Sequence, residues 1–101
     1  MTNDQLENIE TLGEWIATHC ESKADNTRAK MIRDIVRLVT RGQPGDKVYF
    51  HGDPLKYEDA KDHLYALVSQ PRGLQDLVPQ HIEPSLWFEK LLELRNVLTS
   101  I

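Results

Sequence analysis

Histidine and aspartate are residues of this sequence whose side chains could act as metal ligands or as acid–base catalysts. The four histidines are separated along the chain, at His19, His51, His63 and His81, and show no paired spacing. Asp59 and His63 lie four residues apart in a predicted helix, where they would offer two metal ligands on one face. Structural zinc takes four protein ligands and catalytic zinc takes three. The sequence therefore predicts no metal site and no cofactor.

Two short stretches place a titratable group beside a reaction partner. His19 and Cys20 are adjacent in a predicted helix, so their side chains point about 100° apart, and the imidazole cannot take the thiol proton. His51-Gly52-Asp53-Pro54 puts an imidazole and a carboxylate in one turn, and an enzyme would use them with Asp59. The same residue types are also ordinary turn formers, with glycine free to adopt positive φ. We therefore predict that the chain is not an enzyme.

Charged residues form two stripes of opposite sign on the first two predicted helices. The basic stripe spans an arc of about 60° on its helix and consists of Lys30, Arg33, Arg37 and Arg41. The acidic stripe consists of Glu7, Glu10, Glu14 and Glu21. Each stripe can face solvent, pair with the other, or dock a charged partner. The formal net charge of −4 excludes a global basic field, so any nucleic-acid binding must be local to the basic stripe.

Length and composition indicate one small domain over residues 1–101. Hydrophobic residues make up 40% of the chain, which is enough to close one core. No apolar run approaches the roughly 18 residues of a membrane span, and the start of the chain lacks the pattern of a secretory signal. Cys20 is the only cysteine, which excludes an internal disulfide framework. We expect a cytoplasmic protein with no membrane association.

Periodicity predicts four helices. The first covers about residues 4–21, with Asn3 or Asp4 as its N-cap, and the second covers about 27–41 and ends at the Gly42–Gly45 turn. Residues 47–51 have strand composition, and we expect them to pair with a neighbouring extended piece, to lie on the surface, or to add to a strand of another chain. The third helix begins at an Asp53-Pro54 N-terminus and runs to Ser69. A single helical turn over 74–78 and a long helix over 85–100 follow.

The last predicted helix is apolar over more than one face. Its packing seam, the row of apolar residues expected to face the core, consists of Trp87, Leu91, Leu94 and Leu98. Phe88 and Leu92 flank the seam on one side, and Leu86 and Val97 flank it on the other. A helix of this kind either crosses the middle of a fold or buries its surplus against another subunit.

These patterns predict a mainly α, four-helix domain with a short strand or β-ribbon between the second and third helices. The first two helices are expected to form an antiparallel hairpin, crossed by the last helix and closed by the third. We expect a non-enzymatic protein-binding module, such as an adaptor, inhibitor or regulatory subunit, and a homodimer through the last helix. The predicted interface positions are Trp87, Phe88, Leu92 and Val97, with Trp15 either in the core or as a further anchor. The alternative is a nucleic-acid-binding regulator that uses Lys30, Arg33, Arg37 and Arg41.

Overall fold

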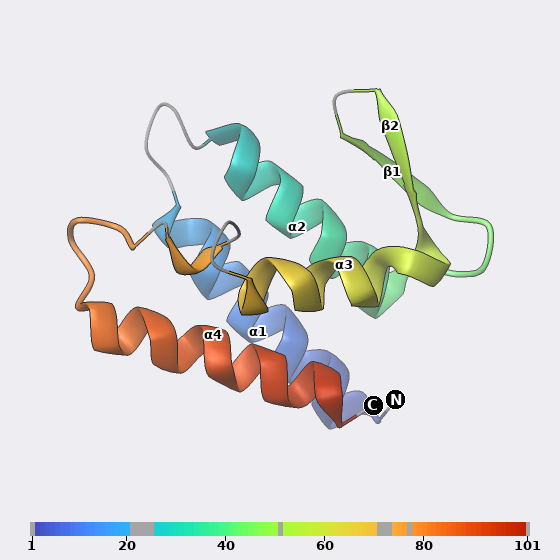
Figure 1. Cartoon of the computed structure of the whole chain (residues 1–101). Helices are drawn as coiled ribbons and strands as arrows, with labels where there is room; N and C mark the ends of the chain where they lie inside the picture. Colours follow the sequence, from blue (N-terminus) through green and yellow to red (C-terminus); the bar gives the residue numbers. More distant parts are fainter. Residues whose placement is uncertain (1, 21–25, 51, 71–73, 77, 101) are drawn as a thin grey trace.

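Four helices and one β-hairpin make up the described part of the chain, which in this computed structural model is residues 2–20, 26–50, 52–70, 74–76 and 78–100 (Figure 1). The elements run α1 (Asn3–His19), α2 (Asn26–Arg41), β1 (Lys47–Phe50), β2 (Asp53–Lys56), α3 (Tyr57–Ser69) and α4 (Pro84–Thr99). The predicted mainly α fold with a β-ribbon between the second and third helices is confirmed. None of the described helices has the length and apolar content needed to cross a bilayer.

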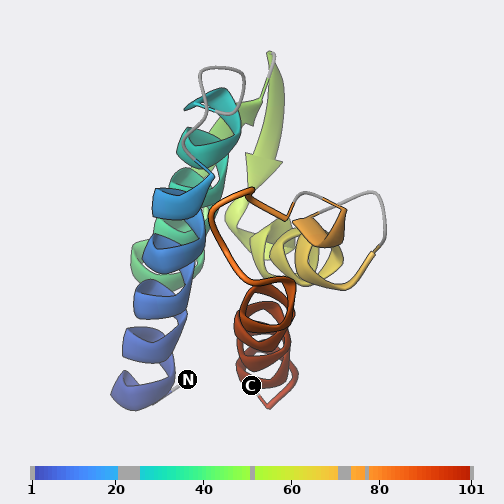
Figure 2. The ribbon, with the colours of Figure 1, turned by 90° about the vertical axis from the view of Figure 1, so that its left-hand side faces the viewer.

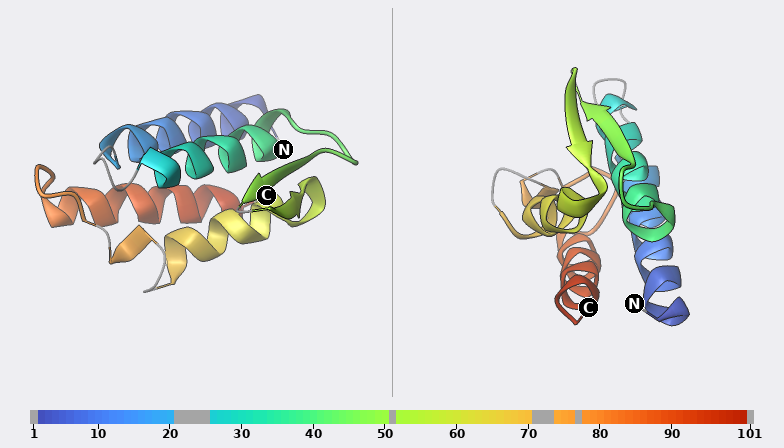
Figure 3. Two further views of the ribbon diagram at one scale, coloured as in Figure 1. Left: turned by 90° about the horizontal axis from the view of Figure 1, so that it is seen from above. Right: turned by 90° about the vertical axis from the view of Figure 1, so that its right-hand side faces the viewer.

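The helices form two layers. The antiparallel pair α1 and α2 makes one layer, and α3 and α4 make the other, as the views along the layers show (Figures 2 and 3). One cluster of buried apolar residues lies between the layers and draws on all four helices. The β-hairpin extends beyond both layers, and the two chain termini lie near each other at one end of the molecule (Figure 1).

A capping box starts α1. The Thr2 hydroxyl accepts from the Gln5 amide at 3.2 Å, and the Gln5 side-chain oxygen accepts from the Thr2 amide at 2.9 Å. The prediction of Asn3 or Asp4 as N-cap was therefore wrong, because a threonine three residues before a glutamine satisfies two otherwise unpaired amides at once. The predicted end at residue 21 lies outside the described residues, and the described helix ends at His19.

Gly13 allows α1 and α2 to approach closely. A Cβ atom at Gly13 would lie 2.4 Å from Cγ2 of Val36 and 2.9 Å from its Cγ1. Contacts this short do not occur between real carbon atoms, so only glycine fits at this point of the helix pair. The closeness also brings the charged margins of the two helices within reach of each other.

The strand predicted at 47–51 pairs with the next extended segment. Val48 lies opposite Leu55, and Tyr49 lies opposite Pro54, in an antiparallel register closed by two residues between Phe50 and Asp53. In a two-residue hairpin the closing pair is hydrogen-bonded and the next pair is not, so the missing amide of Pro54 costs no bond in the ladder.

The Asp53-Pro54 pair was predicted to open the third helix, and this prediction was wrong. Both residues belong to β2, and α3 begins at Tyr57. Proline fixes φ near −65°, a value that suits a first helical turn and also an exposed edge strand. The backbone amide of Tyr57 donates to the Asp46 carbonyl at 2.9 Å, which ties the start of α3 to the start of the hairpin.

Trp87 joins α4 to the segment that precedes it. Its side chain is fully buried, and its indole N–H donates to the carbonyl of Leu74 at 3.0 Å. Leu74 is itself buried and lies with Gln75 in a short π-helical turn, within the region where a single helical turn was predicted. Residue 77 of that prediction lies outside the described residues.

The close approach at Gly13 predicts that Gly13→Ala lowers the free energy of unfolding by about 1–3 kcal/mol, the usual cost of overpacking. In an exposed helix the same change stabilises by roughly 1 kcal/mol, so the sign itself is diagnostic. Chemical denaturation measures the effect. Thr18→Ala, at an exposed position of α1, is the control for a change in helix propensity alone.

The double variant Gly13→Ala with Val36→Ala tests the cause. Removing the two methyl groups gives the new Cβ atom room, so the double variant should be more stable than the sum of the two single changes predicts. If the two changes have strictly additive effects on the free energy of unfolding, Val36 is not what excludes a side chain at position 13.

Candidate interaction surface

The inner face of α4 is buried as its spacing predicted. The seam residues are at most 1% exposed and are Trp87, Leu91, Leu94 and Leu98. They fill the space between α4 and the neighbouring helices α1 and α3. With this seam turned inward, 100° per residue places the remaining apolar side chains on the two margins of the helix.

One margin of α4 exposes two large apolar side chains. Phe88 is 45% exposed and Leu92 is 52% exposed, and they lie one helical turn apart. They border a shallow cavity of about 230 Å³, whose other walls include Val68 and Gln75. The Gln75 side-chain amide donates to the Val68 carbonyl at 3.2 Å and so holds this wall in place. We call Phe88, Leu92 and this cavity the α4 flank.

The opposite margin of α4 is better covered. Leu86 is 38% exposed, whereas Val97 is half-buried against the core. Lys90, on the same margin, lies 5.8 Å above the ring of Trp15. This margin therefore faces α1, and the α4 flank faces away from it.

Three of the residues predicted for the interface, Trp87, Trp15 and Val97, belong to the packed interior or its edge. Trp87 is completely enclosed by its own chain, so it is not available to a partner. Trp15 is half-buried against the core, with its ring centroid 5.9 Å from that of Trp87. Phe88 and Leu92 are the predicted positions that the structure brings together on one open surface.

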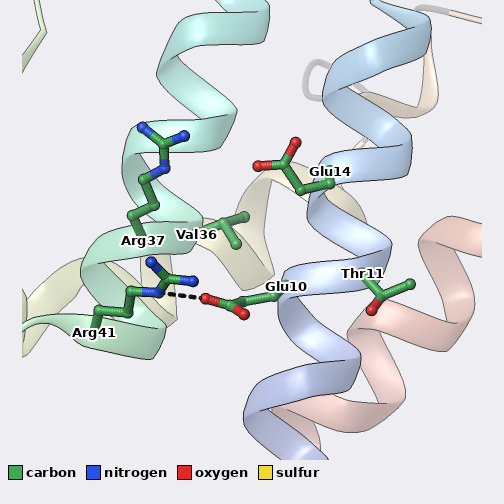
Figure 4. Close-up of a pocket in the computed structure, with 6 residues that line it drawn as sticks. All are labelled: Glu10, Thr11, Glu14, Val36, Arg37 and Arg41. Atoms are coloured by element: carbon green, nitrogen blue, oxygen red, sulfur yellow. Dashed lines mark hydrogen bonds and ion pairs between the residues drawn. The ribbon is translucent and has the colours of Figure 1, made fainter.

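Glu10 and Glu14 of the acidic stripe lie across the groove between α1 and α2 from Arg37 and Arg41 of the basic stripe (Figure 4). Arg41 Nε lies 2.6 Å from Glu10 Oε1, and Arg33 Nε lies 3.8 Å from Glu14 Oε2. The hydrogen bond and the charge of Glu10 raise the pKa of the Arg41 guanidinium above its ordinary value. Arg33 and Arg41 of the basic stripe thus form ion pairs with Glu14 and Glu10 of the acidic stripe.

The groove itself is a solvent-open cavity of about 440 Å³. Its walls are Glu10, Thr11, Glu14, Val36, Arg37 and Arg41. Arg37 is exposed and projects from α2 on the side of Glu14, and Lys30 is also exposed (Figure 4). Glu7 is exposed on α1, and Glu21 lies outside the described residues. A nucleic acid on this face would meet acidic as well as basic groups, which opposes phosphate binding.

The residues considered for catalysis do not form an enclosed site where they are described. Asp53 and Asp59 are both exposed, and His51 lies outside the described residues. Cys20 is buried, as predicted. Within the described ranges, no cluster of three or more His, Cys, Asp or Glu side chains is arranged to hold a metal ion.

One pairing escaped the sequence analysis. His19 Nδ1 lies 3.2 Å from His81 Nε2, although the two residues are 62 positions apart. No local spacing signals such a contact, because it depends on how the segment before α4 returns to the end of α1. This pair is separate from the α4 flank in the residues that form it.

Arg95 and Tyr65 link α4 to α3 beside the α4 flank. Arg95 Nε donates to the Tyr65 hydroxyl at 3.3 Å, and the guanidinium carbon lies 5.7 Å from the ring centroid. The hydrogen bond from Arg95, followed by its positive charge, lowers the pKa of Tyr65 below the ordinary value of 10.0. Arg95 also lines the cavity of the flank, so this contact positions one of its walls.

Comparisons with protein-family models, with curated proteins and with solved structures gave no match for this chain.

The Arg95–Tyr65 contact predicts a pH dependence. Because the folded protein holds the Tyr65 proton less tightly than the unfolded chain, the unfolded state binds more protons between the two pKa values. The contribution of Arg95 to stability should therefore grow as pH rises toward about 10. Chemical denaturation of wild type and Arg95→Met at several alkaline pH values measures how this contribution to the free energy of unfolding changes with pH.

Near-ultraviolet absorbance of the phenolate gives a direct reading of the same contact. Arg95→Met should move the Tyr65 titration, identified by comparison with Tyr65→Phe, to higher pH. Arg37→Met removes an equal guanidinium charge from an exposed position of α2 and is the control. Equal effects of Arg95→Met and Arg37→Met would contradict a specific contact.

Proposed function

We propose that this chain is a non-enzymatic protein-binding module that self-associates through the α4 flank, as a small adaptor, inhibitor or regulatory subunit would. The observation that carries the proposal is the exposure of Phe88 and Leu92 on a helix whose seam is already fully buried. Single exposed apolar residues are normal in soluble proteins, but a contiguous apolar pair beside a cavity is typical of a binding surface.

The position of α4 supports binding by this margin. The helix runs along the outer edge of its layer, and no other described element lies below it in the view of Figure 1. Phe88 offers a ring and Leu92 a branched side chain, while Val68 and Leu91 provide apolar walls for the cavity between α3 and α4. A projecting pair next to a recess is suited to a partner that carries the same two features.

A second copy of the chain meets that requirement. In a two-fold dimer the same patch is used twice, so the projecting Leu92 of one copy meets the flank of the other. An antiparallel crossing at Leu92 brings Glu89 to the level of Arg95 of the second copy, because each lies three residues from Leu92. Opposite charges at matching levels favour this antiparallel orientation over a parallel one.

Sedimentation and light scattering over a range of concentrations test the proposal. Wild type should approach twice the 11.7 kDa chain mass as concentration rises. Burial of each apolar side chain contributes about 1.5–3 kcal/mol. Phe88→Ser with Leu92→Ser should therefore weaken association by at least about 100-fold.

Leu86→Ser is the matched control, since Leu86 is an exposed apolar residue on the other margin of the same helix. It should leave the dissociation constant within about threefold of wild type. A wild-type mass that stays monomeric at all concentrations would contradict self-association. Equal weakening by the control would show that the association is not specific to the α4 flank.

A further inference from the structure

Two histidines lie next to each other at the end of the molecule opposite the chain termini. His19 lies in the last turn of α1, and His81 lies in the segment that leads into α4. The 3.2 Å between His19 Nδ1 and His81 Nε2 is a hydrogen-bond distance, with the ring centroids 5.4 Å apart. His19 is half-buried and His81 is exposed, so solvent reaches the pair.

The His19 ring is held by packing that does not depend on the histidine pair, and a backbone hydrogen bond holds the turn that carries His81. The Trp15 ring lies against His19, with centroids 4.4 Å apart, and Trp15 in turn contacts the buried Trp87. On the other side, the Ile82 amide donates to the Pro79 carbonyl at 3.1 Å and closes the turn that carries His81. The two nitrogens are therefore brought together before any ligand arrives, which reduces the ordering cost of binding one.

We propose that His19 and His81 form an open binding site for a borderline divalent cation of the zinc type, with water in the remaining coordination positions. Zinc–nitrogen bonds are about 2.0–2.1 Å long, so two imidazoles on one tetrahedral ion have nitrogens about 3.3 Å apart. Two neighbouring ligands of an octahedral ion would be about 2.9 Å apart at the same bond length. The observed 3.2 Å lies between these values.

The ligand type selects the class of ion. Neutral imidazole suits Zn²⁺, Ni²⁺ and Cu²⁺, whereas Mg²⁺ and Ca²⁺ take oxygen ligands. The partial negative charge at the carboxyl end of α1 also favours a cation beside His19. For the ion to bind, the ring that donates the hydrogen bond must free its inner nitrogen: a neutral ring shifts its single proton to its outer nitrogen, and a doubly protonated ring releases the inner proton to solvent.

Two protein ligands define an open site of modest affinity, because the described residues provide no third ligand there. Its structural effect is a cross-link between the end of α1 and the segment before α4. Binding to the folded state alone raises stability with the free metal concentration. The site uses none of the residues of the α4 flank, so this proposal stands apart from the proposed self-association.

Calorimetric titration of the metal-free full chain with zinc chloride tests the site. Wild type should bind one ion per chain. His19→Gln and His81→Gln should each lose at least about tenfold in affinity, since even supporting groups around a metal contribute that much. His63→Gln, which replaces a histidine of α3, is the matched control and should bind as wild type does.

Nickel provides an independent reading. Bound Ni²⁺ should quench tryptophan fluorescence, because Trp15 lies against His19, and His19→Gln and His81→Gln should each lose this quenching while His63→Gln keeps it. Far-ultraviolet circular dichroism confirms that each variant is folded. The proposal is overturned by the absence of zinc binding to wild type, or by equal affinity of wild type and both His19→Gln and His81→Gln.

Discussion

Burial of the α4 seam determines how α4 is oriented against α1 and α3 and which of its side chains reach solvent. Trp87 is enclosed completely and its N–H is bonded to the Leu74 carbonyl, so α4 has only one rotation about its axis that satisfies this group. That rotation turns Lys90 toward α1 and Phe88 and Leu92 outward. The exposed apolar surface is thus a consequence of the helical period and not of loose packing.

The second constraint is the close approach of α1 and α2 at Gly13. Gly13 has no side chain, so Val36 packs directly against α1 at this point. The margins of the two helices are therefore close enough for Glu10 to form an ion pair with Arg41. The charge stripes then neutralise each other in part instead of presenting a uniform basic face. This is why we propose the α4 flank, and not the basic stripe, as the recognition surface.

The sequence predicted the features that depend on local periodicity. The four helices and the seam of α4 follow from 3.6-residue spacing, and the two margins of α4 follow once the seam is known. Pro54 was misassigned because its backbone preference fits both a helix start and an edge strand. The His19–His81 contact was not predictable, since residues 62 apart meet only through the tertiary fold. The exposed fraction of Phe88 was likewise not predictable, because it depends on which neighbouring elements cover each margin of α4.

Oxidative cross-linking shows whether the outward margin of α4 lies against the same margin of a second copy. In a Cys20→Ser background, Leu92→Cys places a thiol near the proposed two-fold axis, where the Cα atoms of both copies are within disulfide range. We expect this variant to form a covalent dimer rapidly and Leu86→Cys to form little. Equal cross-linking of the two variants, or none from Leu92→Cys, would contradict it.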